Sequence, residues 1–397
     1  MNASSPADAA RESNQRAMAA MAAGDFSTAR ETLKQALRTS RDNLSLWLNL
    51  AACCRALGEL QNALSAVEEA LKIQPRLFTA LLMKGSLLEQ LHMKQQAAKL
   101  YGAAMAVAPP DDALDPPTKA ALQRARQVHA RYLEELTAFI NAEIDFEHER
   151  GGSAEARRIR SFIELSLRKK KNFRQEPTDF FYPGLPAIQF WERSSFPWLM
   201  DFERASMAIG DELSSILRDD FRDFMPYVAY PEGLPLDQWQ PLNHSRKWGA
   251  LHLLKYGERV EENCRRCPAT MKALSLLPQP VVPGHSPAAM FSALQPHTRI
   301  PPHTGVANTR LVVHLPLVVP EDCGFRVGNE TKFWRVGEAW IFDDTIEHEA
   351  WNDSDEPRVI FICDIWNPLL NENERALVTS VITAMDRFHG AAPVTSL

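Results

Sequence analysis

The sequence predicts an α+β protein of more than one domain: an N-terminal all-α solenoid, then a jelly-roll-like β core with flanking helices. Two observations predict this order. Small residues recur every 34 residues in the first part of the chain, and short apolar runs separated by Pro, Gly, Asn and Asp dominate after residue 280. The chain has 397 residues, which is enough for two or three domains.

The N-terminal repeat emerges when the chain is aligned with itself at a shift of 34 residues. The positions in register are Ala17, Ala51 and Gly85; Gly24 and Gly58; Ala29, Ala63 and Ala97; and Ala36, Ala70 and Ala104, with Pro75 and Pro109 closing the last two units. Small residues suit the close approach of two helices in a hairpin, and proline suits the end of the second helix. The pattern resembles the tetratricopeptide repeat, over residues 10–110.

Stacked repeats of this kind form a curved solenoid with a concave face. We therefore expect the repeat domain to recruit a peptide or protein, either as substrate or as partner. A module that only dimerises or stabilises the chain is the alternative. Residues 111–175 are predicted to hold a capping helix, over 118–144, and a charged linker. A strand-rich domain is expected over 176–370, followed by a C-terminal helix and tail over 371–397.

Composition excludes several classes of protein. The formal net charge of −6 argues against a dedicated nucleic-acid binder, which usually carries a basic face. No apolar run approaches the roughly 20 residues that a membrane helix needs, and the first residues lack the layout of a signal peptide. The expected compartment is the cytoplasm. Six cysteines in so long a chain do not indicate a disulfide scaffold.

Six short apolar runs predict the strands of the C-terminal domain. They are "AAMFSAL", "RLVVHLPLVV", "GFRVG", "TKFWRVG", "EAWIFDD" and "RVIFICDIW". Turn residues between them favour a sandwich or barrel, and no alternation of strands with helices is visible among them. The preceding segment, residues 198–275, has a more helical pattern.

Three histidines and two arginines stand out among these strands. His303 precedes one run, His348 lies 45 residues further on, and Arg358 opens the last run. His314 and Arg310 share one face of their strand, because side chains alternate with period two. Imidazole is a ligand for iron, copper, zinc and nickel, and a guanidinium binds a carboxylate bidentately. The pattern fits a metal with a carboxylate co-substrate, but satisfied core histidines remain the alternative at this level.

The longest motif carries a family resemblance. "HTGVANTRLVVHLPLVVPEDCGFRVGNETKFWRVGEAWIFDDTIEHEAWNDSDEPRVIFICDIWNP" closely resembles the aspartyl/asparaginyl β-hydroxylase family, and the resemblance extends from about residue 178 to 370. It implies a double-stranded β-helix fold and an iron(II)- and 2-oxoglutarate-dependent hydroxylase. By the same resemblance, His303 and His348 are the iron ligands, and Arg358 and Ser292 hold 2-oxoglutarate. His314 matches a histidine beside the other end of that co-substrate, and Asn308 and Arg310 keep an Asn-x-Arg pattern.

Two positions depart from what such oxygenases usually carry. The carboxylate ligand common in this chemistry usually stands two residues after the first histidine, where this chain has Gly305. Members of the family share that absence, so water can complete the iron site, and halide binding makes halogenation an alternative. The family's arginine two residues before the strand histidine is Val312 here, and Arg310 is the residue expected to replace it in the cofactor-binding group.

Other polar positions carry weaker expectations. Asp343 and Asp344 are either partners of the His348 ring or turn residues. Trp248 either lines a substrate cleft or belongs to the core, and the Cys264-x-x-Cys267 pair lacks the second pair that a zinc site needs.

The expected function is hydroxylation of an unactivated C–H bond, first of all in an Asp or Asn residue of a peptide. The alternatives are a small-molecule or lipid hydroxylase or halogenase, a cupin-type metal protein, and a non-catalytic repeat scaffold.

Overall fold

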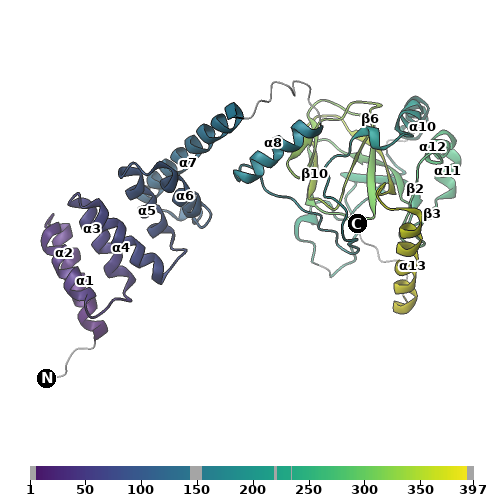
Figure 1. Ribbon diagram of the computed structural model, residues 1–397. Coiled ribbons are helices and arrows are strands. Elements are labelled where there is room, and N and C mark those ends of the chain that lie inside the picture. The colour runs from purple at the N-terminus through teal and green to yellow at the C-terminus, as the bar shows by residue number, and fades with distance from the viewer. Residues whose placement is uncertain (1–5, 144–153, 219–220, 234, 391–397) are drawn as a thin grey trace. The chain divides into compact units, whose positions relative to one another are not determined.

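The computed structural model describes residues 6–143, 154–218, 221–233 and 235–390. The chain divides into two compact units, Met1–Leu167 and Arg168–Leu397 (Figure 1). Within its described residues, no helix is long and apolar enough to cross a membrane.

The first unit is an array of helix hairpins, with each of the first six helices packed on the next. The helices are α1 (Pro6–Ala22), α2 (Phe26–Leu37), α3 (Leu44–Ala56), α4 (Leu60–Ile73), α5 (Phe78–Gln90), α6 (Lys94–Met105), α7 (Pro116–Glu143) and α8 (Ala154–Ser166). Helix α7 matches the capping helix expected from the sequence. Helix α8 lies in the segment predicted as a charged linker, so that segment is not all loop.

Two positions of the third repeat, Gly85 and Tyr101, are in contact and fit one another in size. Gly85 stands where the other repeats have alanine, because a Cβ at Gly85 would lie 2.6 Å from the Tyr101 ring. Tyr101 itself occupies the position of Leu33 and Val67 in the earlier repeats. In the third repeat the larger side chain of Tyr101 is therefore accommodated by the smaller residue Gly85 across the same contact. The turn positions Gly24 and Gly58 have φ values of 80° and 76°, in the left-handed region that glycine tolerates best.

The second unit contains two β-sheets. The larger sheet has the order β1-β2-β4-β11-β6-β9, with β3 paired to β2, and the smaller has the order β5-β10-β7-β8. The strands are β1 (Met225–Pro226), β2 (Trp248–Lys255), β3 (Glu258–Arg259), β4 (Ala289–Leu294), β5 (Thr298–His303), β6 (Arg310–Val318), β7 (Cys323–Val327), β8 (Glu330–Lys332), β9 (Trp340–Phe342), β10 (His348–Asn352) and β11 (Arg358–Trp366). All pairings are antiparallel, as a jelly-roll requires.

Alternation of side chains divides the large sheet into two faces. On one face Phe291, Val313 and Phe361 join a core shared with helices, to which Phe202 and Ile209 also belong. These helices are α9 (Leu199–Arg204), α10 (Ser206–Leu217), α11 (Glu261–Arg266) and α12 (Pro268–Leu274). Figure 1 shows α10, α11 and α12 grouped on one side of the strands, while α13 (Glu372–His389) follows the last strand. The opposite face of the large sheet turns towards the small sheet and carries the site.

Two sequence expectations need correction. The segment predicted as mainly helical, residues 198–275, contains the eight-residue strand β2. Its residues from Trp248 to Leu254 are nearly all buried, so it reads as one apolar run without the alternation that marks a half-buried strand. The run "TKFWRVG" forms only the end of β8, which spans Glu330–Lys332.

His303 ends strand β5, and His348 begins strand β10.

Candidate metal and co-substrate site

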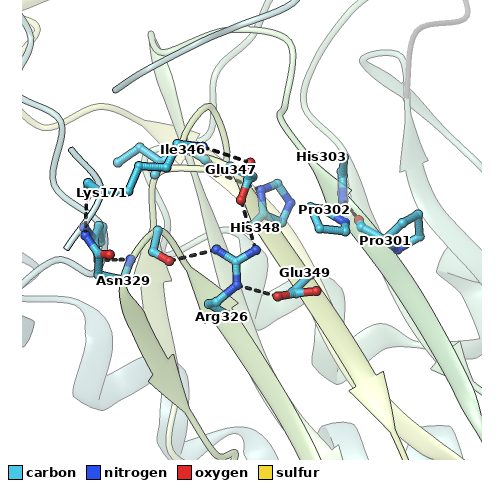
Figure 2. A network of polar contacts seen from close by, with 12 residues as sticks. Lys171, Pro301, Pro302, His303, Arg326, Asn329, Ile346, Glu347, His348 and Glu349 are labelled. Atoms are coloured by element: carbon cyan, nitrogen blue, oxygen red, sulfur yellow. Dashed lines mark hydrogen bonds and ion pairs between the residues drawn. The ribbon is translucent and has the colours of Figure 1, made fainter. Parts of the chain in front are cut away.

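Two histidines face each other across neighbouring strands of the small sheet. His303 and His348 are direct partners in the β5–β10 ladder, and their ring centroids lie 4.1 Å apart. Each Nδ1 contacts a backbone carbonyl two residues earlier in the chain: Pro301 O at 2.8 Å and Ile346 O at 3.0 Å. Figure 2 shows both rings with these neighbours. Because a carbonyl oxygen only accepts, each Nδ1 carries the proton, and each Nε2 keeps a lone pair for a metal.

Burial keeps both rings neutral. It lowers the pKa of His303 to about 4, and it lowers the pKa of His348 well below the usual value, with His303 adding to the effect. A neutral imidazole is the form that binds a metal ion. At neutral pH the pair therefore needs no deprotonation before it can act as a ligand.

The glutamates on either side of His348 are both hydrogen-bonded to Arg326. Arg326 bonds to Glu347, with Nη2 to Oε1 at 3.0 Å, and its Nε bonds to Glu349 (Figure 2). In the part of the chain that the structure describes, no group of three or more His, Cys, Asp or Glu residues is placed to hold a metal. Among the described residues, the histidine pair thus has no carboxylate placed to act with it as a third ligand.

A buried guanidinium lines the same cavity, whose volume is about 440 Å³. Arg358 is 1% exposed, and its Nε and Nη1 have no hydrogen-bond partner among the described residues. Its charged carbon lies 4.8 Å from the centroid of the Trp334 ring. Burial lowers the pKa of Arg358 to about 10, so the group stays charged at neutral pH. A buried charge without a partner is costly, and an anionic ligand would relieve that cost.

Two further predicted residues line the cavity beside Arg358. Ser292 is buried, and its Oγ accepts a hydrogen bond of 3.1 Å from Trp248 Nε1, which leaves the hydroxyl proton free to donate. His314 packs against Phe325 and Phe342, and its Nδ1 lacks a partner within the described residues. Burial, with Arg358 adding, lowers the pKa of His314 well below its usual value. Ser292, Arg358 and His314 thus line the same cavity and offer hydrogen-bond donors to an anion in it.

Comparison with known proteins assigns the domain that holds this site. Residues 204–368 match the family model "Aspartyl/Asparaginyl beta-hydroxylase", and residues 14–77 match "Tetratricopeptide repeat". The C-terminal domain belongs to the aspartyl/asparaginyl β-hydroxylase family. All the residues placed so far around the metal and anion sites lie inside the matched segment.

Curated relatives of the hydroxylase domain act on different molecules, as their names state. The human aspartyl/asparaginyl β-hydroxylase is 37% identical over 203 residues, which is 48% of this chain and 26% of the human protein. The ornithine lipid ester-linked acyl 2-hydroxylase of Rhizobium tropici is 33% identical over 199 residues, which is 49% of this chain and 66% of that protein. The human aspartate β-hydroxylase domain-containing protein 2 is 30% identical over 205 residues, covering 51% of this chain and 53% of that protein.

Asp344 fills the space beside Gly305 in the hydroxylase domain. A Cβ at Gly305 would lie 2.7 Å from Asp344 Oδ1 and closer still to Oδ2. The glycine is therefore a steric requirement of this carboxylate. Asp344 Oδ1 is buried without a partner in the described structure. Burial, partly offset by Arg310, raises the pKa of Asp344 to about 7.

Arg310 lies apart from the anion-binding group. Its Nη1 donates to Asp364 Oδ2 at 2.9 Å, and its Nη2 lies 3.8 Å from Asp344 Oδ2. In the β6–β11 ladder Arg310 is opposite Trp366, eight residues from Arg358. The structure thus brings all six predicted residues, Arg310 included, to the lining of one cavity, but it holds Arg310 in an ion pair with Asp364.

The remaining sequence expectations concern Asp343, Asp344, Trp248 and the cysteines. Asp343 has the turn role, because its Oδ1 accepts from Thr345 N at 3.0 Å, and Nδ1 of His348 bonds to Ile346 instead of to either aspartate. Trp248 is 6% exposed and also lines the cavity, so it has both expected roles. All six cysteines are free and buried.

Among the lining residues that sequence reasoning missed are Tyr227, Trp239, Trp334 and Asp364. Tyr227 and Trp239 stack on Trp248 with centroid distances of 4.1 and 6.2 Å, and Trp239 lies 5.2 Å from the ring of His303. Trp334 lies beside Arg358, in the run "TKFWRVG" that predicts a strand but follows the end of β8. Only the pairing of β6 with β11 reveals Asp364, because nothing in its local sequence links it to Arg310.

Proposed function

We propose that this protein is an iron(II)- and 2-oxoglutarate-dependent hydroxylase of an unactivated C–H bond. One observation carries the proposal: two neutral imidazoles share a cavity with a buried guanidinium, and among the described residues neither Nε2 of the imidazoles nor Nε and Nη1 of Arg358 has a hydrogen-bond partner. The first feature suits a divalent metal and the second suits a carboxylate. A purely structural core would leave neither kind of group unsatisfied.

The residues fit the two absent groups on chemical grounds. His303 and His348 would hold iron through Nε2, with solvent completing the ligand set, since Gly305 supplies no carboxylate. Arg358 and Ser292 would bind the distal carboxylate of 2-oxoglutarate, with His314 beside its other end. Iron supplies the activation of dioxygen that side chains alone lack.

The chain's own residues orient the two imidazoles and exclude water from one side of the site. The carbonyls of Pro301 and Ile346 fix the orientation and tautomer of both imidazoles. Phe325 and Phe342 pack against His348 at 5.8 and 5.4 Å, which restricts water on that side. In the overall balance, one oxygen atom of O₂ enters the C–H bond and the other enters succinate, while 2-oxoglutarate loses CO₂.

The finer assignment that the sequence favoured is an Asp or Asn residue in a peptide, recruited by the repeat domain. A concave repeat surface supports recruitment of a peptide or protein. A lipid or small-molecule substrate has independent support, because one relative is named an acyl 2-hydroxylase. Halogenation is the second candidate reaction. Among the described residues no carboxylate is placed to act as a third iron ligand, so a halide could bind in that position.

Succinate release tests the proposal. Reconstituted protein should convert 2-oxoglutarate to succinate slowly without a prime substrate, and His303→Ala and His348→Ala should each lose this turnover. The matched control is His389→Ala, at the end of α13 and outside the cavity. Arg358→Ala should raise the KM for 2-oxoglutarate by about tenfold or more, because charge-assisted hydrogen bonds contribute roughly 1.5–3 kcal/mol. Iron binding without any dependence on 2-oxoglutarate would favour a cupin-type metal protein, and no binding of either would favour a scaffold.

A further inference from the structure

Residues 171–182 form a strap that lies against both loops beside the histidine pair. The strap belongs to the second unit and precedes the segment that matches the hydroxylase family model. One loop, residues 304–309, follows His303, and the other, residues 343–347, precedes His348. The backbone hydrogen bonds from the strap to these loops are Glu176 N to Thr345 O at 2.7 Å, Thr178 N to Gly305 O at 3.0 Å, and Asp179 N and Phe180 N to Val306 O at 3.1 and 2.9 Å. A segment outside the matched domain therefore holds both loops.

The side chain of Gln175 bridges the two loops. Its Nε2 donates to Asp343 Oδ2 at 2.5 Å and to Pro186 O at 3.3 Å, and its Oε1 accepts from Asn308 Nδ2 at 3.1 Å. Asp343 and Asn308 are both 0% exposed, so water cannot replace Gln175 as their partner. One amide group thus contacts the loops of both histidines.

Both ends of the strap are fixed as well. At the first end Lys171 O accepts from Asn329 Nδ2 at 2.7 Å, and Lys171 Nζ lies 3.6 Å from Glu347 Oε2 (Figure 2). At the other end Asn308 Oδ1 accepts from Tyr182 N at 2.7 Å, and Asn308 Nδ2 donates to Tyr182 O at 2.9 Å. The asparagine of the Asn-x-Arg pattern therefore anchors the strap.

The route from Gln175 to the His348 ring is short. Asp343 Oδ1 accepts from the N–H and the hydroxyl of Thr345 at 3.0 and 2.6 Å, and Asp343 O accepts from Ile346 N at 3.2 Å. Ile346 is also the bridge partner of Gln175 in the backbone. The carbonyl of Ile346 in turn accepts the Nδ1 proton of His348 (Figure 2). Gln175 thus supports, by two routes, the carbonyl that orients this imidazole.

We propose that Gln175 is a positioning residue of the metal site. It holds the loop 343–347 so that Ile346 O keeps His348 in the tautomer that presents Nε2 to the cavity. The inference rests on the proposed function, because iron is the group that this Nε2 would bind. It also makes the strap, which the family model does not cover, a working part of the hydroxylase domain.

The ring nitrogens of the protein without metal report positioning directly. Gln175→Met keeps the length of the side chain and removes its hydrogen bonds. Long-range proton–nitrogen NMR spectra of labelled histidines should show the proton on Nδ1 of both His303 and His348 in the wild type, with His303→Ala and His348→Ala assigning the signals. In Gln175→Met the His348 ring should become a mixture of tautomers. His303 should be unchanged, because its partner Pro301 lies within strand β5.

Metal affinity is the second measurement. Cobalt(II), followed by its visible absorption with 2-oxoglutarate present, should bind about tenfold or more weakly to Gln175→Met, as is typical when a partner around a metal ligand is removed. Thr270→Val is the matched control. It removes a buried hydrogen bond of 2.6 Å to Glu212, among the helices on the other face of the large sheet. The control should lower stability and leave cobalt affinity and both tautomers unchanged.

An exchange of partners separates positioning from loss of packing. Gln175→Glu alone places a second carboxylate against Asp343 and should also weaken cobalt binding. In Gln175→Glu/Asp343→Asn the new amide donates to the new carboxylate, so the same contact forms with its direction reversed, and most of the affinity should return. If the single variants do not fold, hydrogen exchange of the wild type decides. Cobalt should then slow the exchange of the Glu176 and Thr178 amides and leave helix α12 unchanged.

The outcomes separate this inference from the proposed function. An unchanged His348 tautomer in Gln175→Met would overturn the inference, as would an unchanged cobalt affinity, an equal loss in Thr270→Val, or an exchanged pair that recovers nothing. In the hydrogen-exchange experiment, amides of the strap that ignore bound cobalt would overturn it too. If the wild type binds no cobalt, the proposed metal site fails, and the tautomer of His348 still decides whether Gln175 positions the ring.

Discussion

Gly305 offers a direct test of the packing around the histidine pair. The perturbation is Gly305→Ala. Its φ lies outside the left-handed region, so alanine can adopt the backbone conformation, and only the new methyl group matters. That group would overlap the Asp344 carboxylate, which is buried and held close by the hydrogen bond from Gly305 N to Asp344 O at 2.7 Å.

The magnitude follows from two opposing terms. Overpacking a well-filled site costs about 1–3 kcal/mol, while replacing glycine by alanine at a compatible position gains about 0.4–1 kcal/mol through the unfolded chain. We therefore expect Gly305→Ala to lower the free energy of unfolding by about 1–2 kcal/mol. Gly210→Ala is the matched control: it lies in helix α10 with nothing within 4 Å of its Cβ position, so it should stabilise.

Urea unfolding followed by tryptophan fluorescence is the assay. Eight of the nine tryptophans lie in the second unit, since only Trp47 belongs to the first, so the signal reports the hydroxylase domain. The double variant Gly305→Ala/Asp344→Gly should recover most of the loss, because the overlapping carboxylate is gone. If Gly305→Ala stabilised the domain as Gly210→Ala does, or if the Asp344 change were merely additive, the steric argument would be refuted.

Three further predictions concern charge and packing. Arg358→Met should raise the apo-protein's free energy of unfolding by about 1 kcal/mol or more, because it removes a buried unpaired charge, and should abolish the rise in Tm on adding 2-oxoglutarate; lower apo stability would contradict this. Because burial raises the folded pKa of Asp344 to about 7, above its usual 3.8, the unfolded state binds fewer protons between these values, and stability should fall as pH rises from about 4 to 7. In unfolding curves across that range Asp344→Asn should flatten part of this fall, and an unchanged pH slope would show that Asp344 is ionised throughout. Gly85→Ala should destabilise the repeat unit in thermal unfolding followed by circular dichroism, while Gly85→Ala/Tyr101→Leu should recover stability; no recovery would mean that the Tyr101 ring is not the obstacle.

The sequence predicted what depends on local pattern and on long motifs. The register of Ala29, Ala63 and Ala97 predicted helix hairpins, and all three are fully buried. Apolar runs predicted strands β4, β6 and β11 nearly to the residue. The family resemblance supplied His303, His348, Ser292 and Arg358, which the structure gathers in one cavity.

What the sequence could not give depends on pairing across the sheet. Strand β2 was missed because a strand buried on both faces has no alternating pattern. The commitment of Arg310 to Asp364 follows from the register of β6 against β11, and 54 residues separate the two in the chain. The meaning of Gly305 required the position of Asp344, which only the packed structure supplies.

Anaerobic titration with iron(II) in the presence of 2-oxoglutarate tests the central claim most directly. The account predicts one iron per chain and a visible charge-transfer band, lost in His303→Ala and His348→Ala and retained in His389→Ala. Tight iron binding that survives both histidine changes, or a band that ignores 2-oxoglutarate, would contradict it.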